Sequence, residues 1–64
     1  MQLNGKTYPY RTGLTLHAVI ADLGLRHDAI VVMRGDDVYK RGKIPDVQLE
    51  QNDVVEIVRM MQGG

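Results

Sequence analysis

A single amphipathic helix, placed early in a short chain, is the feature that most constrains the fold. Its apolar residues recur at i, i+3, i+4 and i+7, and are Leu16, Val19, Ile20 and Leu23. Thr15 is the expected N-cap, because its hydroxyl can accept from a free amide of the first turn. Gly24 suits the position just past the last turn, with Leu25 closing over the end. The pattern predicts one helix of about eight to ten residues, whose apolar face must be covered by other elements.

The remaining apolar runs are short and typical of strands. Residues 1–3 and 7–10 flank Asn4-Gly5, a strong signal for a two-residue hairpin turn. Residues 29–33 are apolar and β-branched, which predicts a strand that is buried on one face and partly covered on the other. Gly35 then opens a polar turn that also holds Asp36-Asp37, which we interpret as turn residues rather than magnesium ligands.

Two further strands are predicted in the second half of the chain. Val38-Tyr39 suits a short return strand, followed by an irregular segment that Gly42 and Pro45 interrupt. The run from residue 54 to residue 59 predicts the final strand. Val55 and Ile57 share one face of it, whereas Val54, Glu56 and Val58 share the other.

The element order predicts an α+β fold. A hairpin, one helix and two or three later strands are most simply buried when the helix lies across a mixed sheet of four to five strands. This is the β-grasp (ubiquitin-like) arrangement, with one main helix packed on one face. We expect a single domain over residues 1–64, with a flexible C-terminal tail from about residue 60.

The residue types that most enzymes need are missing or isolated. The chain has no cysteine, which excludes disulfides, cysteine–zinc clusters and a cysteine nucleophile. His17 and His27 have no evident Ser/Asp or carboxylate partners, so we expect surface histidines, no hydrolase and no metal site. No glycine-rich loop opens a helix to hold phosphate. We therefore expect no cofactor bound by this chain.

Charge and hydropathy narrow the class of partner. Eight basic and eight acidic residues cancel, so no overall field favours nucleic acid or an anionic membrane. No apolar stretch approaches the roughly 18 residues of a membrane span, and the start lacks the regions of a signal peptide. We expect a cytoplasmic protein. Lys40, Arg41 and Lys43 beside Tyr39 could contact RNA or an acidic partner, but zero net charge favours a solvated loop.

The chain ends in Gly63-Gly64, directly after the predicted last strand and the bridge Met60-Met61-Gln62. Glycine lacks a Cβ, so such a tail can adopt conformations closed to other residues and thread a narrow channel. Its α-carboxylate is the best candidate for a reacting group, although a frayed terminus is the simpler interpretation.

With this order and this tail, nearly the whole chain resembles the ThiS family of small sulfur carriers. Residues 1–6 resemble the family's opening strand and turn, and Thr15-Leu16 resembles its helix start. Residues 29–32 stand where the family has an alanine- and valine-rich strand. The most telling segment is Leu49 to Val58 followed by Met60 to Gly64, which is similar to the family's acidic turn, last strand and diglycine tail.

The resemblance implies a carrier and co-substrate rather than a catalyst. A ThiF-like adenylyltransferase would use MgATP to activate Gly64 as an acyl-adenylate, with Gly63 letting the tail thread the channel. Sulfur from a cysteine-desulfurase relay would then give a thiocarboxylate, which a thiazole synthase would consume to make the thiazole of thiamine. The partner would supply the catalysis, and binding would supply proximity.

Several alternatives stay open on the sequence. The recipient could instead be molybdopterin, a tRNA or cysteine synthesis, or Gly64 could form an isopeptide bond as a protein modifier. From a different class, the chain could be a non-catalytic β-grasp interaction module. Val58, Met60 and Met61 are candidates for a partner-docking patch, because methionine adapts to more than one surface. For Val58, ordinary core packing is an equal alternative.

Overall fold

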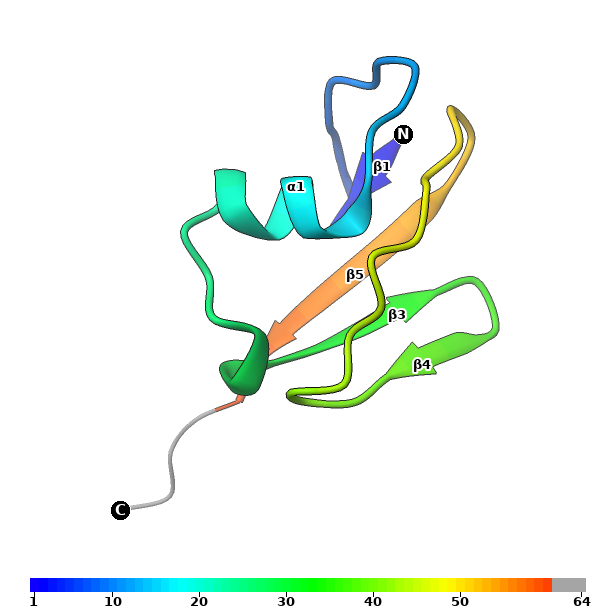
Figure 1. Ribbon diagram of the computed structural model, residues 1–64. Coiled ribbons are helices and arrows are strands. Elements are labelled where there is room, and N and C mark those ends of the chain that lie inside the picture. The colour runs from blue at the N-terminus through cyan, green and yellow to red at the C-terminus, as the bar shows by residue number, and fades with distance from the viewer. Residues whose placement is uncertain (61–64) are drawn as a thin grey trace.

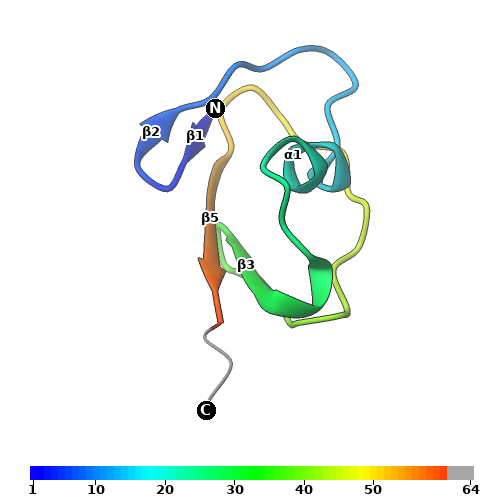
Figure 2. The same cartoon turned by 90° about the vertical axis from the view of Figure 1, so that its left-hand side faces the viewer.

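A computed structural model of the chain describes residues 1–60. Its elements run in the order β1 (Gln2–Leu3), β2 (Lys6–Thr7), α1 (Leu16–Asp22), a 3₁₀ turn (His27–Ala29), β3 (Ile30–Arg34), β4 (Asp37–Tyr39) and β5 (Val54–Arg59). The strands form one five-stranded sheet in the order β2-β1-β5-β3-β4. Helix α1 crosses one side of this sheet, as Figure 1 and the turned view of Figure 2 show. The predicted α+β, β-grasp architecture is confirmed.

Strand β5 lies at the centre of the sheet although it comes last in the sequence. It pairs in parallel with β1, with Leu3 opposite Val55, and antiparallel with β3, with Val32 opposite Ile57. Because β1 and β5 lie at opposite ends of the chain, this parallel pair needs the whole of the intervening chain as its crossover.

The opening hairpin forms as the Asn4-Gly5 pair predicts. Asn4 has φ +52° and Gly5 φ +80°, the positive values that a tight two-residue hairpin turn requires. The second strand is shorter than predicted, since β2 ends at Thr7. After Thr7 the Tyr8 amide still donates to the Met1 carbonyl at 2.9 Å, and the chain then turns away at Pro9, which has no N–H to continue the ladder.

Helix α1 begins at the predicted cap. The Thr15 hydroxyl accepts from the Ala18 amide at 3.3 Å, which satisfies one of the free donors of the first turn. The helix ends in a Schellman motif, in which the Leu25 amide donates to Ile20 and the Gly24 amide to Ala21. Gly24 adopts φ +69° to close it. At seven residues the helix is shorter than predicted, and Leu23, which we expected on the apolar face, is 40% exposed at the C-cap.

The core is a single apolar cluster between α1 and the sheet. Its buried members are Leu3, Leu14, Leu16, Val19, Ile20, Ile30, Val32, Ile44, Leu49, Val55 and Ile57. Ile44 and Leu49 come from the irregular segment between β4 and β5. This segment passes the start of the helix and forms a bridge from Gln48 to Thr15. The strand predicted at residues 29–33 begins one residue later, because Ala29 belongs to the 3₁₀ turn.

Candidate functional site

The candidate site lies where β5 ends, because the predicted reactive tail continues from that point. Arg59 is opposite Ile30 at the start of β3. One residue further on, the Met60 amide donates to the Ala29 carbonyl at 2.8 Å. The body of the protein therefore holds the chain as far as Met60. Met61, Gly63 and Gly64 lie outside the described residues.

The N-terminal half of β5 is held on its other side by an unusual contact. The ladder between β1 and β5 continues from the Gln2 amide, which donates to Asp53, to the Asn4 amide, which donates to Val55. The next amide, that of Ile57, donates to the side-chain Oδ1 of Asn4 at 2.7 Å. The Asn4 side chain thus replaces the backbone where β1 has already turned away, and it satisfies a donor that would otherwise lack a partner.

Val58 and Met60 are both exposed. Val58 is 44% exposed and Met60 40%, so of the two interpretations of Val58, core packing is wrong. The side chains of β5 alternate as predicted, with Val55 and Ile57 buried and Val54, Glu56 and Val58 on the face away from the helix.

The face away from the helix is apolar over three strands. Cross-strand partners share a face, and the register pairs Val31 with Val58, and Met33 with both Glu56 and Val38. We call this surface the open face; its residues are Val31, Met33, Val38, Val54, Glu56 and Val58. In Figure 2 it lies on the side of the sheet opposite the helix, where no described segment covers it. The sequence analysis placed Val54 on this face by the alternation along β5, but it named neither Val54 nor Val38 as a docking residue.

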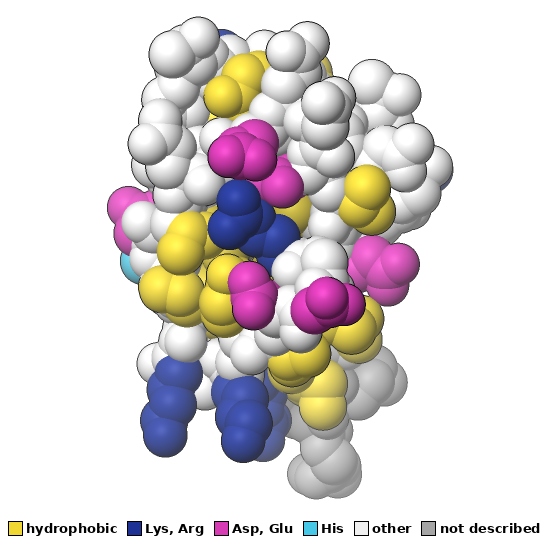
Figure 3. Space-filling model, turned by 90° about the vertical axis from the view of Figure 1, so that its right-hand side faces the viewer, with side chains coloured by type: hydrophobic (Ala, Val, Ile, Leu, Met, Phe, Trp, Pro, Cys, Tyr) yellow, Lys and Arg dark blue, Asp and Glu magenta, His cyan; other side chains and the backbone are white. Residues whose placement is uncertain are grey.

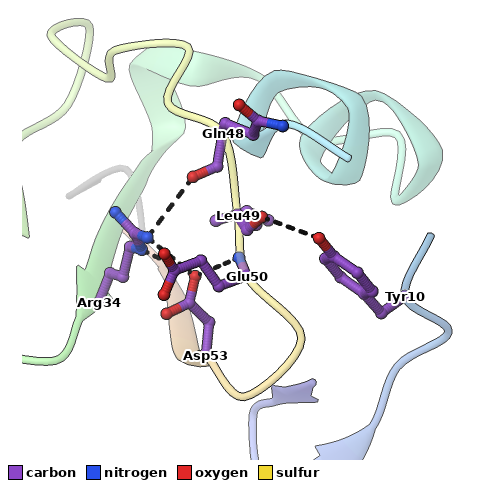
Figure 4. Close-up of polar contacts among 6 residues, drawn as sticks. All are labelled: Tyr10, Arg34, Gln48, Leu49, Glu50 and Asp53. Atoms are coloured by element: carbon purple, nitrogen blue, oxygen red, sulfur yellow. Dashed lines mark hydrogen bonds and ion pairs between the residues drawn. The ribbon is translucent and has the colours of Figure 1, made fainter. Parts of the chain in front are cut away.

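Side-chain contacts of Asp53 hold the start of β5, just as the backbone hydrogen bond of Met60 holds its end. Asp53 Oδ2 accepts from Nε of Arg34 at 3.0 Å and from the Glu50 amide at 2.7 Å, and Arg34 Nη2 also reaches the Gln48 carbonyl at 3.5 Å (Figure 4). The Asp53 hydrogen bond is the main cause that raises the pKa of Arg34. In the same view the Tyr10 hydroxyl donates to the Leu49 carbonyl.

The two histidines are not isolated, which corrects the sequence interpretation. The rings of His17 and His27 meet edge to face, with centroids 4.4 Å apart. His17 Nε2 lies 2.7 Å from the Ile44 carbonyl, and because a carbonyl only accepts, that nitrogen carries the proton. The His17 backbone amide donates to Asp46 at 3.1 Å. This hydrogen bond is the largest of the effects that lower the pKa of Asp46.

Among residues 1–60, no group of three or more histidine, cysteine or acidic side chains gathers as metal ligands would. Over the same range, no helix is both long and apolar enough to pass through a membrane.

Among the described residues one α-helix lies across a mixed sheet, and the central strand of that sheet is the last one in the sequence. Together with the diglycine that follows in the sequence, this arrangement defines a ubiquitin-like (β-grasp) protein. Comparison with known proteins makes the assignment narrower. The chain belongs to the ThiS family, whose family model matches residues 1–64.

Two sulfur carriers support that assignment, and a third relative is similar over part of its length. The chain is 36% identical over 62 residues to the sulfur carrier protein ThiS of Thermus thermophilus, covering 97% of this chain and 95% of that protein. It is 32% identical over 66 residues to the sulfur carrier protein ThiS of Bacillus subtilis, covering 100% and 98%. It is also 31% identical over 64 residues to a thiazole synthase of Magnetococcus marinus, of which it spans only 20%.

Proposed function

We propose that this chain is a sulfur carrier that acts through the carboxylate of Gly64. The observation that carries the proposal is its end-to-end similarity to two proteins named as sulfur carriers, which it covers over 95% and 98% of their lengths. The experiment below tests directly whether Gly64 carries the sulfur.

The proposed chemistry has two steps. A carboxylate oxygen of Gly64 attacks the α-phosphorus of MgATP bound to a ThiF-like adenylyltransferase, and pyrophosphate leaves. In the second step the outer sulfur of a persulfide from a cysteine-desulfurase relay attacks the acyl carbon, and AMP leaves. A thiol then attacks the relay sulfur of the resulting acyl disulfide, which releases the thiocarboxylate and leaves a disulfide on the relay. Gly64 has no side chain to obstruct either attack, and Gly63 lets the tail enter a narrow channel. The chain is the co-substrate, and the partner binds the nucleotide in the cytoplasm, where ATP is supplied.

The proposed sulfur acceptor is the thiazole precursor of thiamine, handled by a thiazole synthase. Support comes from the relative that is itself named a thiazole synthase and that contains, within a fifth of its length, a segment similar to the whole of this chain. A carrier sequence joined to the synthase in one polypeptide gives the synthase a high local concentration of its sulfur donor. Transfer to molybdopterin, tRNA, cysteine or a target lysine has no comparable support.

The fold supports a role in delivery. The chain leaves the sheet at the end of its central strand, where β5 is paired with β3 as far as Arg59 and Met60 is hydrogen-bonded to Ala29. The open face lies next to this exit and offers the apolar surface that a partner needs while it holds the tail. Val58 and Met60 are the described members of the predicted docking patch.

The test is the intact mass of the full chain after incubation with the adenylyltransferase of the same organism, MgATP and a sulfur source. We expect exchange of one oxygen for sulfur, localised to the Gly64 peptide and trapped by a thiol-reactive alkylating agent. The trap is needed because oxidation of any of the four methionines adds nearly the same mass. A reaction without ATP and a chain lacking Gly63-Gly64 are the controls. If Gly64 stays unmodified while the same enzyme activates another carrier, the chain is an interaction module instead.

A further inference from the structure

Four of the eight lysines and arginines lie together at the end of the molecule from which the tail leaves: Lys40, Arg41, Lys43 and Arg59, which we call the basic collar. Two contacts place them there. Arg59 is opposite Ile30, and the turn after β4 is held against the 3₁₀ turn because the Gly42 amide donates to the His27 carbonyl at 2.8 Å. Figure 3 shows the lysine and arginine side chains that gather at this lower end of the molecule.

The collar residues are exposed and are not used by the fold. All four are exposed to solvent, and within residues 1–60 no ion pair joins any of them to a carboxylate. Arg34 and Arg26 differ, since Arg34 pairs with Asp53 and Arg26 with Asp28. Arg41 acts on Asp28 only through its charge, as a minor contribution to the lowered pKa of that carboxyl. The four charges are therefore available to a partner.

Acidic residues gather at the opposite end of the sheet. Asp36 and Asp37 lie at the turn between β3 and β4, and Glu50 and Asp53 lie at the turn that leads into β5. The formal net charge is zero, yet the charges are separated along β5, from an acidic start to a basic end. A molecule with this charge separation is oriented by the field of a charged partner before contact.

Chain length brings the collar close to any enzyme that takes the tail. Residues 61–64 can span at most about 14 Å when fully extended, so an enzyme that holds Gly64 must approach Met60 within that distance. The collar lies beside this point of exit, with Arg59 at the end of β5 and the other three residues just after β4. The enzyme surface that the collar meets is therefore the rim of the channel that admits the tail.

We propose that the basic collar docks against an acidic rim around the tail channel of the activating enzyme, and that this pairing orients the chain end for entry. This inference rests on the proposed function. A nucleic acid is the less suitable occupant, because Tyr39, the aromatic side chain beside the cluster, is partly buried and packs against the core. It is thus not available to stack on a base, as single-strand binding requires, and the acidic end repels phosphates.

The test compares two full-length double variants that each lose two positive charges. Lys40→Gln/Lys43→Gln removes collar charges, and Lys6→Gln/Arg11→Gln removes exposed charges remote from the tail exit. Pyrophosphate release by the adenylyltransferase gives kcat/KM at about 20 mM and about 0.5 M salt. We expect the collar variant to lose about tenfold at low salt and to come within about twofold of the unsubstituted chain at high salt. The control variant should match the unsubstituted chain at both.

A second measurement uses the unsubstituted chain, so that it does not depend on how a variant folds. Carbodiimide joins lysine amines directly to carboxylates, and we expect Lys40 and Lys43, but not Lys6, to be cross-linked to aspartate or glutamate of the enzyme. Equal kcat/KM for both variants, or cross-links absent from Lys40 and Lys43 in a chain that is adenylated, overturns the collar alone. The proposal for the collar is also overturned if the collar variant loses binding to a fluorescent single-stranded RNA while its adenylation is unchanged. A chain that is never adenylated overturns the proposed function as well.

Discussion

Nη2 of Arg34, at the end of β3, lies 2.9 Å from Oδ2 of Asp53, the residue directly before β5. Both side chains are largely buried, at 22% and 17% exposed, and Asp53 also accepts from the Glu50 amide. One carboxylate therefore ties the β3 strand to the turn that sends the chain into its central strand. The exposed pair of Arg26 and Asp28 offers a natural comparison, because it joins residues only two apart.

Arg34→Met should destabilise the protein by about 1–3 kcal/mol, because it leaves the partly buried Asp53 carboxylate without its charged donor. Chemical denaturation measured by circular dichroism checks this. Arg26→Met is the matched control, and it should leave the midpoint unchanged, since exposed pairs contribute little. Equal midpoints for both variants would show that the β3 contact does not stabilise the turn.

Asn4 has two separable roles, a positive φ and a hydrogen bond to Ile57. Asn4→Gly keeps the backbone conformation and removes the side-chain acceptor, so we expect a loss of about 1 kcal/mol. Asn4→Ala should lose about 1 kcal/mol more, because alanine is strained at positive φ. Urea denaturation of the two variants measures both terms. Identical losses would mean that the turn conformation costs alanine nothing.

The elements that sequence alone predicted are those with local causes. Thr15 and Gly24 delimit the helix through contacts with residues at most four positions away, and Asn4-Gly5 determines its own turn. Contacts between distant residues left no local signal. The Asn4 side chain meets an amide 53 residues away, and Arg34 meets Asp53 across 19.

In the candidate site too, features with local causes were predicted from the sequence, and features that depend on distant contacts were not. Alternation along β5 predicted that Val55 and Ile57 are buried, whereas the exposure of Val58 depended on whether a second layer covers that side of the sheet. The two histidines meet because the helix and the 3₁₀ turn fold toward the same segment. Their ten-residue separation has no helical or strand period that would have indicated it.

Val58→Asp should impair activation of the tail without unfolding the protein. The side chain is 44% exposed, so the charge stays in water when the chain is free but must be desolvated against an apolar partner. We expect kcat/KM for pyrophosphate release to fall at least about tenfold, the effect of roughly 1.4 kcal/mol. Leu23→Asp is the control, because Leu23 is 40% exposed at the end of the helix. Equal rates for the two variants would remove the open face from the docking surface.

Thr15→Ala should cost about 1 kcal/mol by removing the helix cap, and Thr15→Ser should restore most of it because serine retains the hydroxyl. The cap is visible in the 3.3 Å contact with the Ala18 amide. Thermal unfolding of the three proteins gives the comparison. Should serine behave like alanine, the methyl group of Thr15 rather than its hydroxyl would be the stabilising feature.

Ionisation of Asp46 should make the free energy of unfolding depend on pH in the acid range. The His17 amide, with smaller contributions from the Thr15 hydroxyl and the nearby histidines, lowers the folded-state pKa of Asp46. Its stabilisation is therefore complete above the unfolded pKa of about 4 and is lost as pH falls through the lower folded value. The difference in unfolding free energy between the unsubstituted chain and Asp46→Asn should shrink as pH falls below about 4. Urea denaturation across that range measures it, and a difference independent of pH would contradict the assignment.

The central position of β5 has a consequence for how the protein is made. Ribosomes deliver residues 54–59 after every other strand, so β1 and β3 have no neighbour to join them until synthesis of the domain is nearly over. A nascent chain stopped before β5 cannot close its sheet, and the exposed edges of β1 and β3 leave it open to proteolysis. The cell's stock of folded molecules is thereby restricted to those translated through β5.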